Sequence, residues 1–243
     1  MKLSVISDIH ANVEAFKAIL DDMKTLDIEA VVSLGDNIGY GPEPEEVLRM
    51  LRELNIPSVM GNHELAVKDQ DFIEWFNHEA KRSIQKTIKM LSKKAVSYVT
   101  SLPSFILRYE YRFVHGFPPD SPIIYLFQKL GQGIADEFKK LREKICFIGH
   151  THDIMLLEFD GNFVDFFSLG KGVINLDKSK QYIINAGSVG QPRDGNNNAK
   201  YIIFDTESFD LEIRFVPYDI ASVVKKILRA GLPEVHAFRL WYG

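Results

Sequence analysis

The amino-acid sequence predicts an α/β protein, with parallel strands in its first half and antiparallel strands in its second. Short apolar runs alternate with helical patterns over residues 3–60, which is typical of a parallel sheet with helical crossovers. From residue 155 onward, strand patterns follow one another with turn residues between them, and this favours antiparallel pairing. The chain has 243 residues, of which 46% are hydrophobic, so it can bury a substantial core.

The N-terminal segment has a βαβαβ pattern. Apolar runs at residues 3–7, 30–34 and 57–60 predict buried strands. Residues 12–26 and 43–54 carry apolar side chains at helical spacing, and the second of these begins with proline and glutamate residues that favour a helix N-terminus. We therefore expect three parallel strands joined by right-handed crossovers.

The rest of the chain predicts a helical segment followed mainly by strands. Residues 64–100 are expected to form a helical insert or lid. Further strands are expected at 105–109, 112–114, 145–148, 155–159, 163–169, 182–185, 201–205 and 211–216, with helices near 133–141 and 220–229. No repeat, linker or low-complexity segment interrupts this order, so we expect residues 1–243 to form a single domain.

The composition excludes several classes of protein. The net charge of −4 and the pI of about 6.0, without a basic stripe, argue against dedicated nucleic-acid binding and against a nuclease. Cys146 is the single cysteine, which excludes an internal disulfide and a thiolate metal cage. The sequence has no run of 18 apolar residues, and the run at residues 1–7 is too short for a signal peptide. We therefore expect a cytoplasmic protein without a membrane partner.

Five short polar motifs each follow a predicted strand directly. They are Asp8-Ile9-His10, Gly35-Asp36-Asn37, Gly61-Asn62-His63-Glu64, His115-Gly116 and Gly149-His150-Thr151-His152. The carboxyl ends of strands are where open α/β sheets build their sites, so we expect these side chains to lie close together. One such motif alone is usually a turn or a helix cap. All of them in this position predict a functional site.

The motifs offer imidazole nitrogen and carboxylate oxygen atoms, which suit divalent transition metals better than calcium. Asp8 and His10 are two residues apart, as are His150 and His152. In an extended segment, residues two apart point to the same side, so each pair can reach one small volume. The sequence therefore predicts a site for transition metal ions.

These motifs resemble those of the calcineurin-like metallophosphoesterase superfamily, whose pattern is D-x-H, G-D, G-N-H-[DE], H and G-H-x-H. The resemblance covers nearly the whole chain, from Asp8 to at least Asn197. It implies a fold of two packed mixed sheets flanked by helices. It also implies an enzyme that hydrolyses phosphate esters with two divalent metal ions, and we favour manganese over iron, zinc and nickel.

The resemblance also implies a role for each motif residue. The implied ligands form two sets that share one residue: Asp8, His10, Asp36 and His152 for one metal, and Asp36, Asn62, His115 and His150 for the other. Asp36 would bridge the two ions, and His63 would be the general acid and not a ligand. Two cations about 3.5–4 Å apart can hold a bridging hydroxide and neutralise charge in an in-line phosphoryl-transfer transition state.

The substrate class follows less directly from the motifs. Protein Ser/Thr phosphatases of the superfamily carry G-D-x-V-D-R-G, whose Arg contacts phosphate, whereas this chain has G-D-N-I-G-Y-G from Gly35 to Gly41. The symmetrical diadenosine tetraphosphate hydrolases share that Arg and are disfavoured for the same reason. The chain is more similar to the small prokaryotic phosphodiesterase branch, through D-I-H-x-N, G-Y-G-P and the segment N-x-G-S-V-G-Q-P-R at residues 185–193.

Some members of that branch hydrolyse cyclic nucleotides or other diesters, and some cleave dinucleoside polyphosphates. We therefore expect hydrolysis of phosphodiesters or nucleotide phosphoanhydrides, with a small phosphorylated molecule such as a nucleotide as the substrate. A phosphomonoesterase or protein phosphatase is the alternative activity. A non-catalytic scaffold on the same fold is the alternative without activity, and it is disfavoured because every expected ligand position and His63 are filled.

Two residues outside the ligand sets are candidates for substrate binding. Arg193 can bind phosphate oxygens bidentately, and its alternative role is a loop salt bridge with Asp194. Asn12 can orient ligands or substrate, and its alternative role is to cap the first helix.

Aromatic residues suggest further contacts. Phe72, Trp75 and Phe76 can stack on a nucleobase, although helix core is the better interpretation for at least two of them. Phe117 stands where the branch usually has serine and is expected to line or narrow the substrate pocket. The aromatic tail at residues 236–243 is expected either to form a subunit interface in a homo-oligomer or to dock on its own domain.

Overall fold

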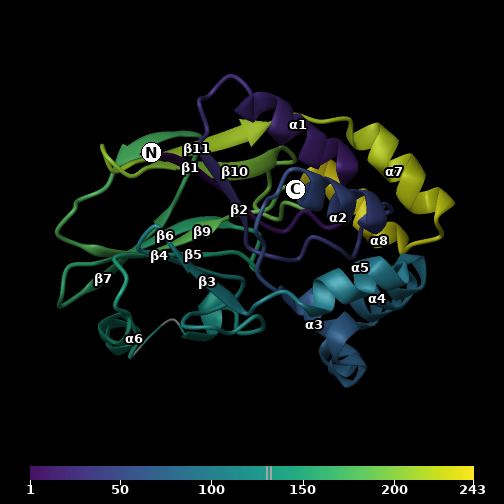
Figure 1. Ribbon diagram of the computed structural model, residues 1–243, viewed down its shortest axis with the longest axis horizontal. Helices are drawn as coiled ribbons and strands as arrows, with labels where there is room; N and C mark the ends of the chain where they lie inside the picture. The colour runs from purple at the N-terminus through teal and green to yellow at the C-terminus, as the bar shows by residue number, and fades with distance from the viewer. Residues whose placement is uncertain (130, 132) are drawn as a thin grey trace.

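The computed structural model describes residues 1–129, 131 and 133–243, and it contains two mixed β-sheets that pack against each other between layers of helices (Figure 1). One sheet has the strand order β2-β1-β10-β11-β8, and the other has β3-β4-β5-β9-β6-β7. The strands are β1 (Lys2–Ile6), β2 (Ala30–Ser33), β3 (Phe105–Arg108), β4 (Tyr111–Val114), β5 (Ile145–Ile148), β6 (Ile154–Phe159), β7 (Val164–Ser168), β8 (Gly172–Asn175), β9 (Gln181–Ala186), β10 (Ala199–Asp205) and β11 (Asp210–Val216). The helices are α1 (Val13–Met23), α2 (Pro44–Glu53), α3 (Asn62–Lys68), α4 (His78–Met90), α5 (Lys93–Thr100), α6 (Ile134–Lys140), α7 (Ile220–Arg229) and α8 (Glu234–Tyr242). The two-sheet α/β architecture confirms the fold class that the resemblance implied.

The first sheet begins with the predicted β-α-β unit, because β1 and β2 are parallel and Leu3 lies opposite Ala30. The predicted third strand at residues 57–60 is wrong in extent and is reduced to one bridge between Ser33 and Ser58. Pro57 has no N–H to donate to a ladder, and the N–H of Met60 turns away to bond the carbonyl of Pro103 at 2.7 Å.

Antiparallel strands complete the first sheet on the other side of β1. Strand β10 pairs with β1 and with β11, as the strand patterns at residues 201–205 and 211–216 predicted. Strand β8 pairs with β11 and was missed by the sequence analysis. It contains four residues and is mostly exposed, so it has neither the length nor the alternation that identifies a strand.

The second sheet combines both kinds of pairing. Strands β4, β5 and β9 are parallel, whereas β3, β6 and β7 pair antiparallel with their neighbours. The parallel pair β5 and β9 differs from the antiparallel arrangement expected after residue 155. This parallel core gives the motifs after β4 and β5 a common edge.

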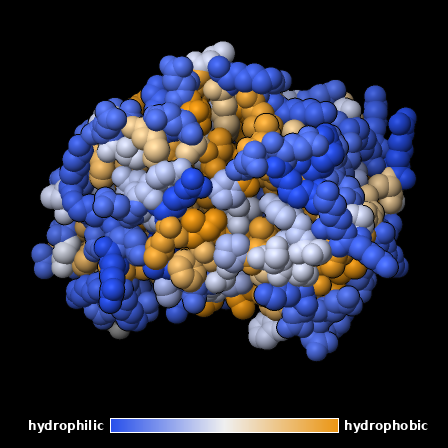
Figure 2. All heavy atoms as spheres, in the orientation of Figure 1, coloured by the Kyte–Doolittle hydropathy of each residue, from blue (hydrophilic) through white to orange (hydrophobic). Residues whose placement is uncertain are grey.

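The two sheets bury a shared apolar core. Leu3, Val5 and Phe204 from the first sheet pack against Phe113 and Phe147 from the second. Full burial of such a side chain is worth about 1.5–3 kcal/mol relative to leaving it in water. In Figure 2 the apolar residues gather in the middle of the visible face, and hydrophilic residues cover its periphery.

Helices close the outer face of each sheet. Phe16 and Ile19 of α1 and Val47 and Leu51 of α2 pack on the first sheet in one cluster that includes Ile6. On the second sheet, Ile134 and Phe138 of α6 cover Cys146 and Ile148. Burial raises the pKa of the Cys146 thiol, so this cysteine is an inert core residue, as the sequence suggested.

The predicted helical segment after residue 64 is confirmed as α3, a 3-10 helix (Gln70–Trp75), α4 and α5. Side-chain caps divide it: Asn77 Oδ1 accepts from Ala80 N at 3.0 Å, and Ser92 Oγ accepts from Ala95 N at 3.2 Å. These caps start new helices within one continuous apolar face. The segment lies beside the two sheets and not over either of them (Figure 1).

The C-terminal segment contains one helix more than predicted. Helix α7 begins after Asp219, whose Oδ1 accepts from Ser222 N at 3.0 Å. The residues interpreted as a tail form α8, which buries Ala237 and Leu240 against Val223 of α7. The tail therefore docks on its own domain, and its exposed side leaves Trp241 and Tyr242 in solvent. Among the described residues, no helix is long and apolar enough to span a membrane.

Candidate metal centre

The five motifs converge in one buried volume where the edges of the two sheets meet. The residues that the resemblance implied as ligands are all buried there: Asp8, His10, Asp36, Asn62, His115, His150 and His152. Ligand atoms of Asp8, His10 and His152 lie within 4.8 Å of one another. Those of Asp36, His115 and His150 form a second cluster of the same size.

Tight loops bring these side chains together. Asp8, His10, Asp36, His150 and His152 all have left-handed backbone conformations, with φ between 48° and 71°. For a residue other than glycine, this conformation costs roughly 1–2 kcal/mol, so the surrounding structure has to hold it. The sequence alone gave no signal of this strain.

Backbone hydrogen bonds hold the strained loops to one another. They join Asp8 N to Gly35 O (3.1 Å), His10 N to Asp36 O (2.9 Å), Gly149 N to His115 O (2.8 Å) and Gly190 N to Asp8 O (2.9 Å). These bonds join the loops after β1, β2 and β9 into one group and the loops after β4 and β5 into another. The two groups are connected by the N–H of His150, which donates to Asp8 Oδ2 at 3.1 Å.

In the first cluster, imidazole nitrogen atoms of two histidines face each other. His10 Nδ1 lies 3.1 Å from the carbonyl of Ile38, and His152 Nδ1 lies 2.5 Å from that of Gln191. A neutral imidazole that donates through Nδ1 has a bare electron pair on Nε2. These two Nε2 atoms are only 3.2 Å apart, and Asp8 Oδ1 lies 3.1 Å from His152 Nε2. A cation between them would relieve the repulsion of electron pairs placed so close together.

The charge states agree with this interpretation. Burial and the nearby charge of Arg193 lower the pKa of His152 to about 4, so it is neutral at pH 7. Burial alone would raise the pKa of Asp8. The nearby His152 and His10 outweigh this effect and hold the pKa well below its usual range. Asp8 Oδ2 accepts from Ser7 Oγ at 2.5 Å and from His150 N at 3.1 Å, which leaves Oδ1 for the cluster.

The second cluster also concentrates electron pairs. His115 Nδ1 donates to the carbonyl of Leu34 at 2.9 Å, and His115 Nε2 lies 3.1 Å from His150 Nδ1 and 3.2 Å from Asn62 Oδ1. Burial lowers the pKa of His150 to about 3. Burial alone would lower the pKa of His115, but the nearby charges of Asp36, Asp8 and Glu64 together raise it to about 9. This cluster therefore stabilises a positive charge, which a proton or a metal ion can supply.

Asp36 lies between the two clusters. Its Oδ1 accepts from His63 N at 2.9 Å. Its Oδ2 lies 3.4 Å from His115 Nε2 in one cluster and 3.8 Å from His10 Nε2 in the other. Burial would raise the pKa of this carboxyl, but His115 and His63 hold it far below its usual range. This is the placement that a bridging ligand needs, as the resemblance implied.

His63 is buried beside Asp36, with Nε2 3.9 Å from Asp36 Oδ2. Within the described residues, neither ring nitrogen has a hydrogen-bond partner. The ring packs edge-on against Tyr40 and Phe76. A Cβ at Gly39 would lie 2.0 Å from His63 Nδ1, and Gly39 has φ of +86°, so only glycine fits there. Proximity to Asp36 and His10 is compatible with either a ligand or a proton donor.

Glu64 is a site residue that the sequence analysis quoted without assigning a role. It is fully buried, and its carboxylate accepts from the N–H groups of Asp36 (2.9 Å), Asn37 (2.8 Å) and Gly61 (2.9 Å). Burial and the charge of Asp36 raise its pKa to about 7. Glu64 joins the loop of Asp36 to the loop of Asn62. Its position in the pattern G-N-H-[DE] was the signal that could have indicated this role.

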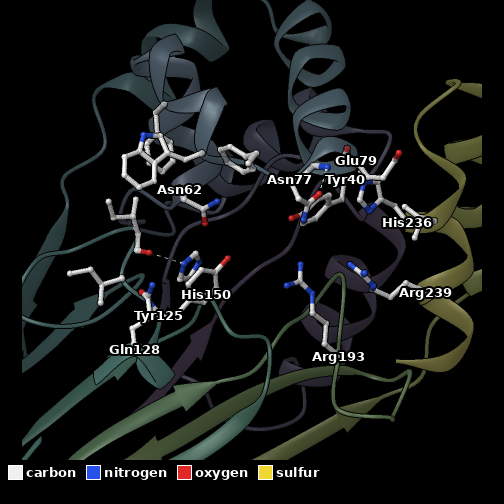
Figure 3. A pocket seen from close by; sticks show the side chains of 17 residues that line it. Tyr40, Asn62, Asn77, Glu79, Tyr125, Gln128, His150, Arg193, His236 and Arg239 are labelled. Carbon is white, nitrogen blue, oxygen red and sulfur yellow. Dashed lines mark hydrogen bonds between the residues drawn. The ribbon is translucent and has the colours of Figure 1, made fainter. Parts of the chain in front are cut away.

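A cavity of about 700 Å³ opens onto Asn62 and His150. Figure 3 shows these two residues on its wall, between Tyr125 on one side and Arg193 and Arg239 on the other. Phe72, Trp75 and Phe76 also line it. Trp75 is 81% exposed, whereas Phe72 and Phe76 pack on the core, as expected for at least two of the three.

The expectation that Phe117 lines the pocket is wrong. Its side chain is 2% exposed and belongs to the core beneath the loop that follows β4. Its N–H bonds the carbonyl of Ile124, so it supports the loop that carries Tyr125. Tyr125 is the aromatic residue that reaches the site, where its ring stacks on His150 with centroids 3.7 Å apart.

The two candidates for substrate binding differ in their surroundings. Asn12 Oδ1 accepts from Ala15 N at 3.0 Å and its Nδ2 donates to Gly190 O at 2.9 Å, which favours the capping role. Arg193 lines the cavity, and Asp194 instead bonds Lys200 Nζ at 2.5 Å. The alternative salt bridge between Arg193 and Asp194 is therefore wrong within the described residues.

Helix α8 adds two cavity residues that the sequence analysis missed. His236 is buried and stacks on Tyr40, with centroids 4.4 Å apart. Arg239 lies on the same wall as Arg193. Their signals were weak, because the helix is short and its apolar positions are interrupted by aromatic residues that face solvent. Pro233 before Glu234 was the available sign of a helix start.

The donor set fits two divalent transition metal ions. It consists of imidazole nitrogen atoms, carboxylate oxygen atoms and one amide oxygen, arranged in two clusters around a shared aspartate. Each imidazole either is neutral or carries a proton that a metal ion can displace. Imidazole and carboxylate together suit manganese, iron, zinc or nickel.

The chain belongs to the calcineurin-like phosphoesterase superfamily, whose domain profile matches residues 1–208. It is therefore a metallophosphoesterase, a hydrolase that acts on phosphate ester bonds.

Relatives cover the whole length of the chain. It is 38% identical over 246 residues to an uncharacterized protein of Methanocaldococcus jannaschii, covering 99% of this chain and 98% of that protein. The crystal structure of a metallophosphoesterase from Sphaerobacter thermophilus superposes with a TM-score of 0.84 at 34% identity, covering 100% of this chain and 98% of that one. A segment of 61 residues, 25% of this chain, is 39% identical to serine/threonine-protein phosphatase 2 of Escherichia coli and covers 28% of it.

Proposed function

We propose that this chain hydrolyses phosphodiesters or nucleotide phosphoanhydrides, with two divalent metal ions and with His63 as the proton donor. The observation that carries this proposal is the pair of clusters around Asp36, in which electron pairs of buried ligands face one another at about hydrogen-bond distance. Bound divalent ions supply Lewis acidity and neutralise negative charge that develops on the phosphoryl oxygens. We favour manganese for both positions.

The residues divide the work between holding the ions and binding substrate. Asp8, His10 and His152 would hold one ion, and Asn62, His115 and His150 the other, with Asp36 Oδ2 shared. Asn62 coordinates without adding negative charge, which keeps the site attractive to an anionic substrate. Tyr125, stacked on His150, and the side chains of Phe72, Trp75 and Phe76 give one side of the cavity an aromatic lining.

His63 is placed to protonate the leaving oxygen. Burial lowers its pKa well below its ordinary value, so the ring is neutral at pH 7 before substrate binds. A phosphate anion beside the ring favours its protonated form and raises that pKa. The imidazolium can then donate to the leaving oxygen, a step worth about 10²–10⁴-fold in rate.

The surroundings of Tyr40 support a small diester or anhydride over a phosphoprotein. Tyr40 stands where the phosphatase pattern G-D-x-V-D-R-G has its Arg. Here the guanidinium comes from another loop, since Arg193 Cζ lies 5.7 Å from the centroid of the Tyr40 ring. Arg193 would therefore contact phosphate from a different loop than the Arg of the phosphatase motif does. The sequence likeness to serine/threonine-protein phosphatase 2 of Escherichia coli spans one short segment of 61 residues.

A metal analysis and a substrate panel test the proposal. Protein reconstituted with Mn²⁺ should retain about two equivalents and hydrolyse bis(p-nitrophenyl) phosphate or dinucleoside polyphosphates in preference to a phosphoserine peptide. Preference for the peptide would contradict the substrate class. Retention of one equivalent, unchanged in Asp36→Asn, would contradict the bridged centre.

The role of His63 is tested by changing the leaving group. His63→Ala should keep both metals, lose modest activity on nitrophenyl esters and lose about 10²–10⁴-fold on nucleoside esters, whose leaving oxygen needs a proton. Loss of a metal would identify His63 as a ligand. His78→Ala is the matched control, because His78 is exposed on α4 and should retain wild-type activity on every ester.

A further inference from the structure

Two arginines from different parts of the chain meet at one end of the cavity. Arg193 belongs to the loop after β9, and Arg239 belongs to α8, beyond the matched domain at residues 1–208. Arg193 Nη2 donates to Gln191 Oε1 at 3.1 Å, and Arg239 Nη1 approaches the same oxygen at 3.5 Å. One neutral acceptor is therefore shared by two cations.

The positive charge of this pair is not balanced by a carboxylate. Within residues 1–129, 131 and 133–243, neither guanidinium forms an ion pair. Asp194, the acid nearest in sequence to Arg193, bonds the buried Lys200 instead. Glu79 also lines the cavity, but its carboxylate accepts from Arg82 at 3.1 Å and lies 2.8 Å from His78 Nδ1.

Both arginines are partly removed from water. Arg193 Nε is buried and has no hydrogen-bond partner within the described part of the chain. Burial and then the charge of Arg193 lower the pKa of Arg239. Like charges held together at the wall of a cavity are unfavourable unless an anion joins them, and a planar guanidinium binds phosphate oxygens in pairs.

The position of the pair relates it to the metal centre. The cavity that Arg193 and Arg239 line also opens onto Asn62 and His150 (Figure 3). The charge of Arg193 also acts on the metal centre, where it helps to lower the pKa of His152. A ligand whose reacting phosphate lies at Asn62 and His150 therefore extends along the cavity toward both guanidinium groups.

We infer that Arg193 and Arg239 form a subsite for a second phosphate group, so that the preferred substrates are phosphoanhydrides such as nucleoside or dinucleoside polyphosphates. This inference rests on the proposed function and narrows its substrate class. Helix α8 thereby adds a specificity determinant that the matched domain does not contain. Phe72, Trp75 and Phe76 line the same cavity and offer aromatic surface to the part of the ligand that is not phosphate.

The kinetic test compares two substrates in the Mn²⁺-loaded protein. Bis(p-nitrophenyl) phosphate has one phosphate group, and a dinucleoside tetraphosphate has several. Arg239→Gln should lower kcat/KM for the tetraphosphate at least about tenfold more than for the aryl diester, mainly through KM, because hydrogen bonds to charged groups are lost. Arg239→Lys should restore part of the loss. Arg229→Gln, at an exposed position on the neighbouring helix α7, should leave both substrates unchanged.

A binding measurement keeps the inference separate from the proposed activity. Calorimetry on metal-free protein should show that inorganic pyrophosphate binds wild type at least about tenfold more tightly than Arg239→Gln. If neither substrate is hydrolysed but this difference holds, the proposed function fails and the subsite stands. Equal losses on both substrates, with pyrophosphate affinity unchanged, would overturn the subsite and leave the proposed function standing.

Discussion

The carboxylate of Glu64 lies beside the candidate metal centre and is not among the expected metal ligands. It accepts the backbone N–H groups of Asp36, Asn37 and Gly61, so it fixes two ligand loops at once. A hydrogen bond to a charged group is worth about 1.5–3 kcal/mol, and an unsatisfied buried donor costs a comparable amount. The geometry of the centre therefore depends on this buried acid.

Replacement of Glu64 by Gln should weaken metal binding. The Gln amide offers one acceptor oxygen and turns its NH₂ group toward backbone N–H donors, so at least one loop has to move. Loss of such a supporting contact typically lowers metal affinity about 10–100-fold. Titration of metal-free protein with Mn²⁺ measures this effect. Glu53→Gln, exposed on α2, is the matched control. Equal affinity in wild type and Glu64→Gln would show that the loops do not depend on the carboxylate.

Single residues also show where prediction from the sequence ends. The motifs identified side chains that the structure buries close together, because residue type and spacing are visible in the sequence. The tautomers of His10 and His152 depend on the carbonyls of Ile38 and Gln191, which come from other loops. Phe117 was placed in the pocket because it stands where the resembling branch usually has serine, yet its side chain points into the core.

Helix α1 and strand β11 are linked by an ion pair near the end of the helix. Asp22 Oδ1 and Oδ2 accept from Arg214 at 2.7 and 3.1 Å, and Oδ2 also accepts from the Tyr201 hydroxyl at 2.6 Å. Burial opposes ionisation, but these donors lower the pKa of Asp22. The carboxylate therefore ties the helix layer to two strands of the sheet.

Asp22→Asn should destabilise the protein by about 1–2 kcal/mol at pH 7, since solvent screens part of this half-exposed pair. Because the folded pKa is depressed, the stability is fully present above the unfolded pKa of about 3.9 and is lost as pH falls through the folded value. Urea unfolding should show a constant difference from wild type between pH 7 and 5 that narrows below pH 4. Asp21→Asn, in an exposed pair with Lys24, should change stability little. A gap that persists undiminished at low pH would exclude the ion pair as its cause.

Elements were predictable where local signals agreed. Helices α1, α2 and α7 have clear apolar periodicity, and α1 and α7 also have side-chain caps at Asn12 and Asp219. The length of the strand at residues 57–60 was overestimated from its apolar residues. Pro57 cannot donate a hydrogen bond, and the N–H of Met60 bonds Pro103 instead of a neighbouring strand. Strand β8 and helix α8 depend on tertiary packing for their stability, so no local pattern was strong enough to reveal them.

The metal centre joins the two halves of the molecule. Asp8, His10 and Asp36 follow strands of the first sheet, and His115, His150 and His152 follow strands of the second. The order of the strands in these sheets could not be predicted from the sequence patterns, because periodicity does not fix which strands become neighbours. Ions bound here would connect both sheets in addition to the shared core.

Metal binding should therefore stabilise the whole chain. A ligand that binds only the folded state adds about 2.7 kcal/mol when its concentration is 100 times its Kd. Mn²⁺ at saturation should raise the free energy of unfolding by about this amount or more, and the single domain expected over residues 1–243 should unfold in one transition. Denaturant unfolding followed by both fluorescence and circular dichroism checks this. Asp36→Asn should show a smaller increase. Two separate transitions would contradict a single domain.

The strained ligand loops have a consequence for how this protein can evolve. Their shape is maintained by backbone hydrogen bonds between loops and by the carboxylate of Glu64. Exchange of a left-handed Asp or His for glycine would relieve strain, so drift toward greater stability erodes the site while leaving the architecture intact. Only selection for the chemistry opposes that drift. A descendant that no longer needed its metals could keep this shape and be free to acquire a different use for it.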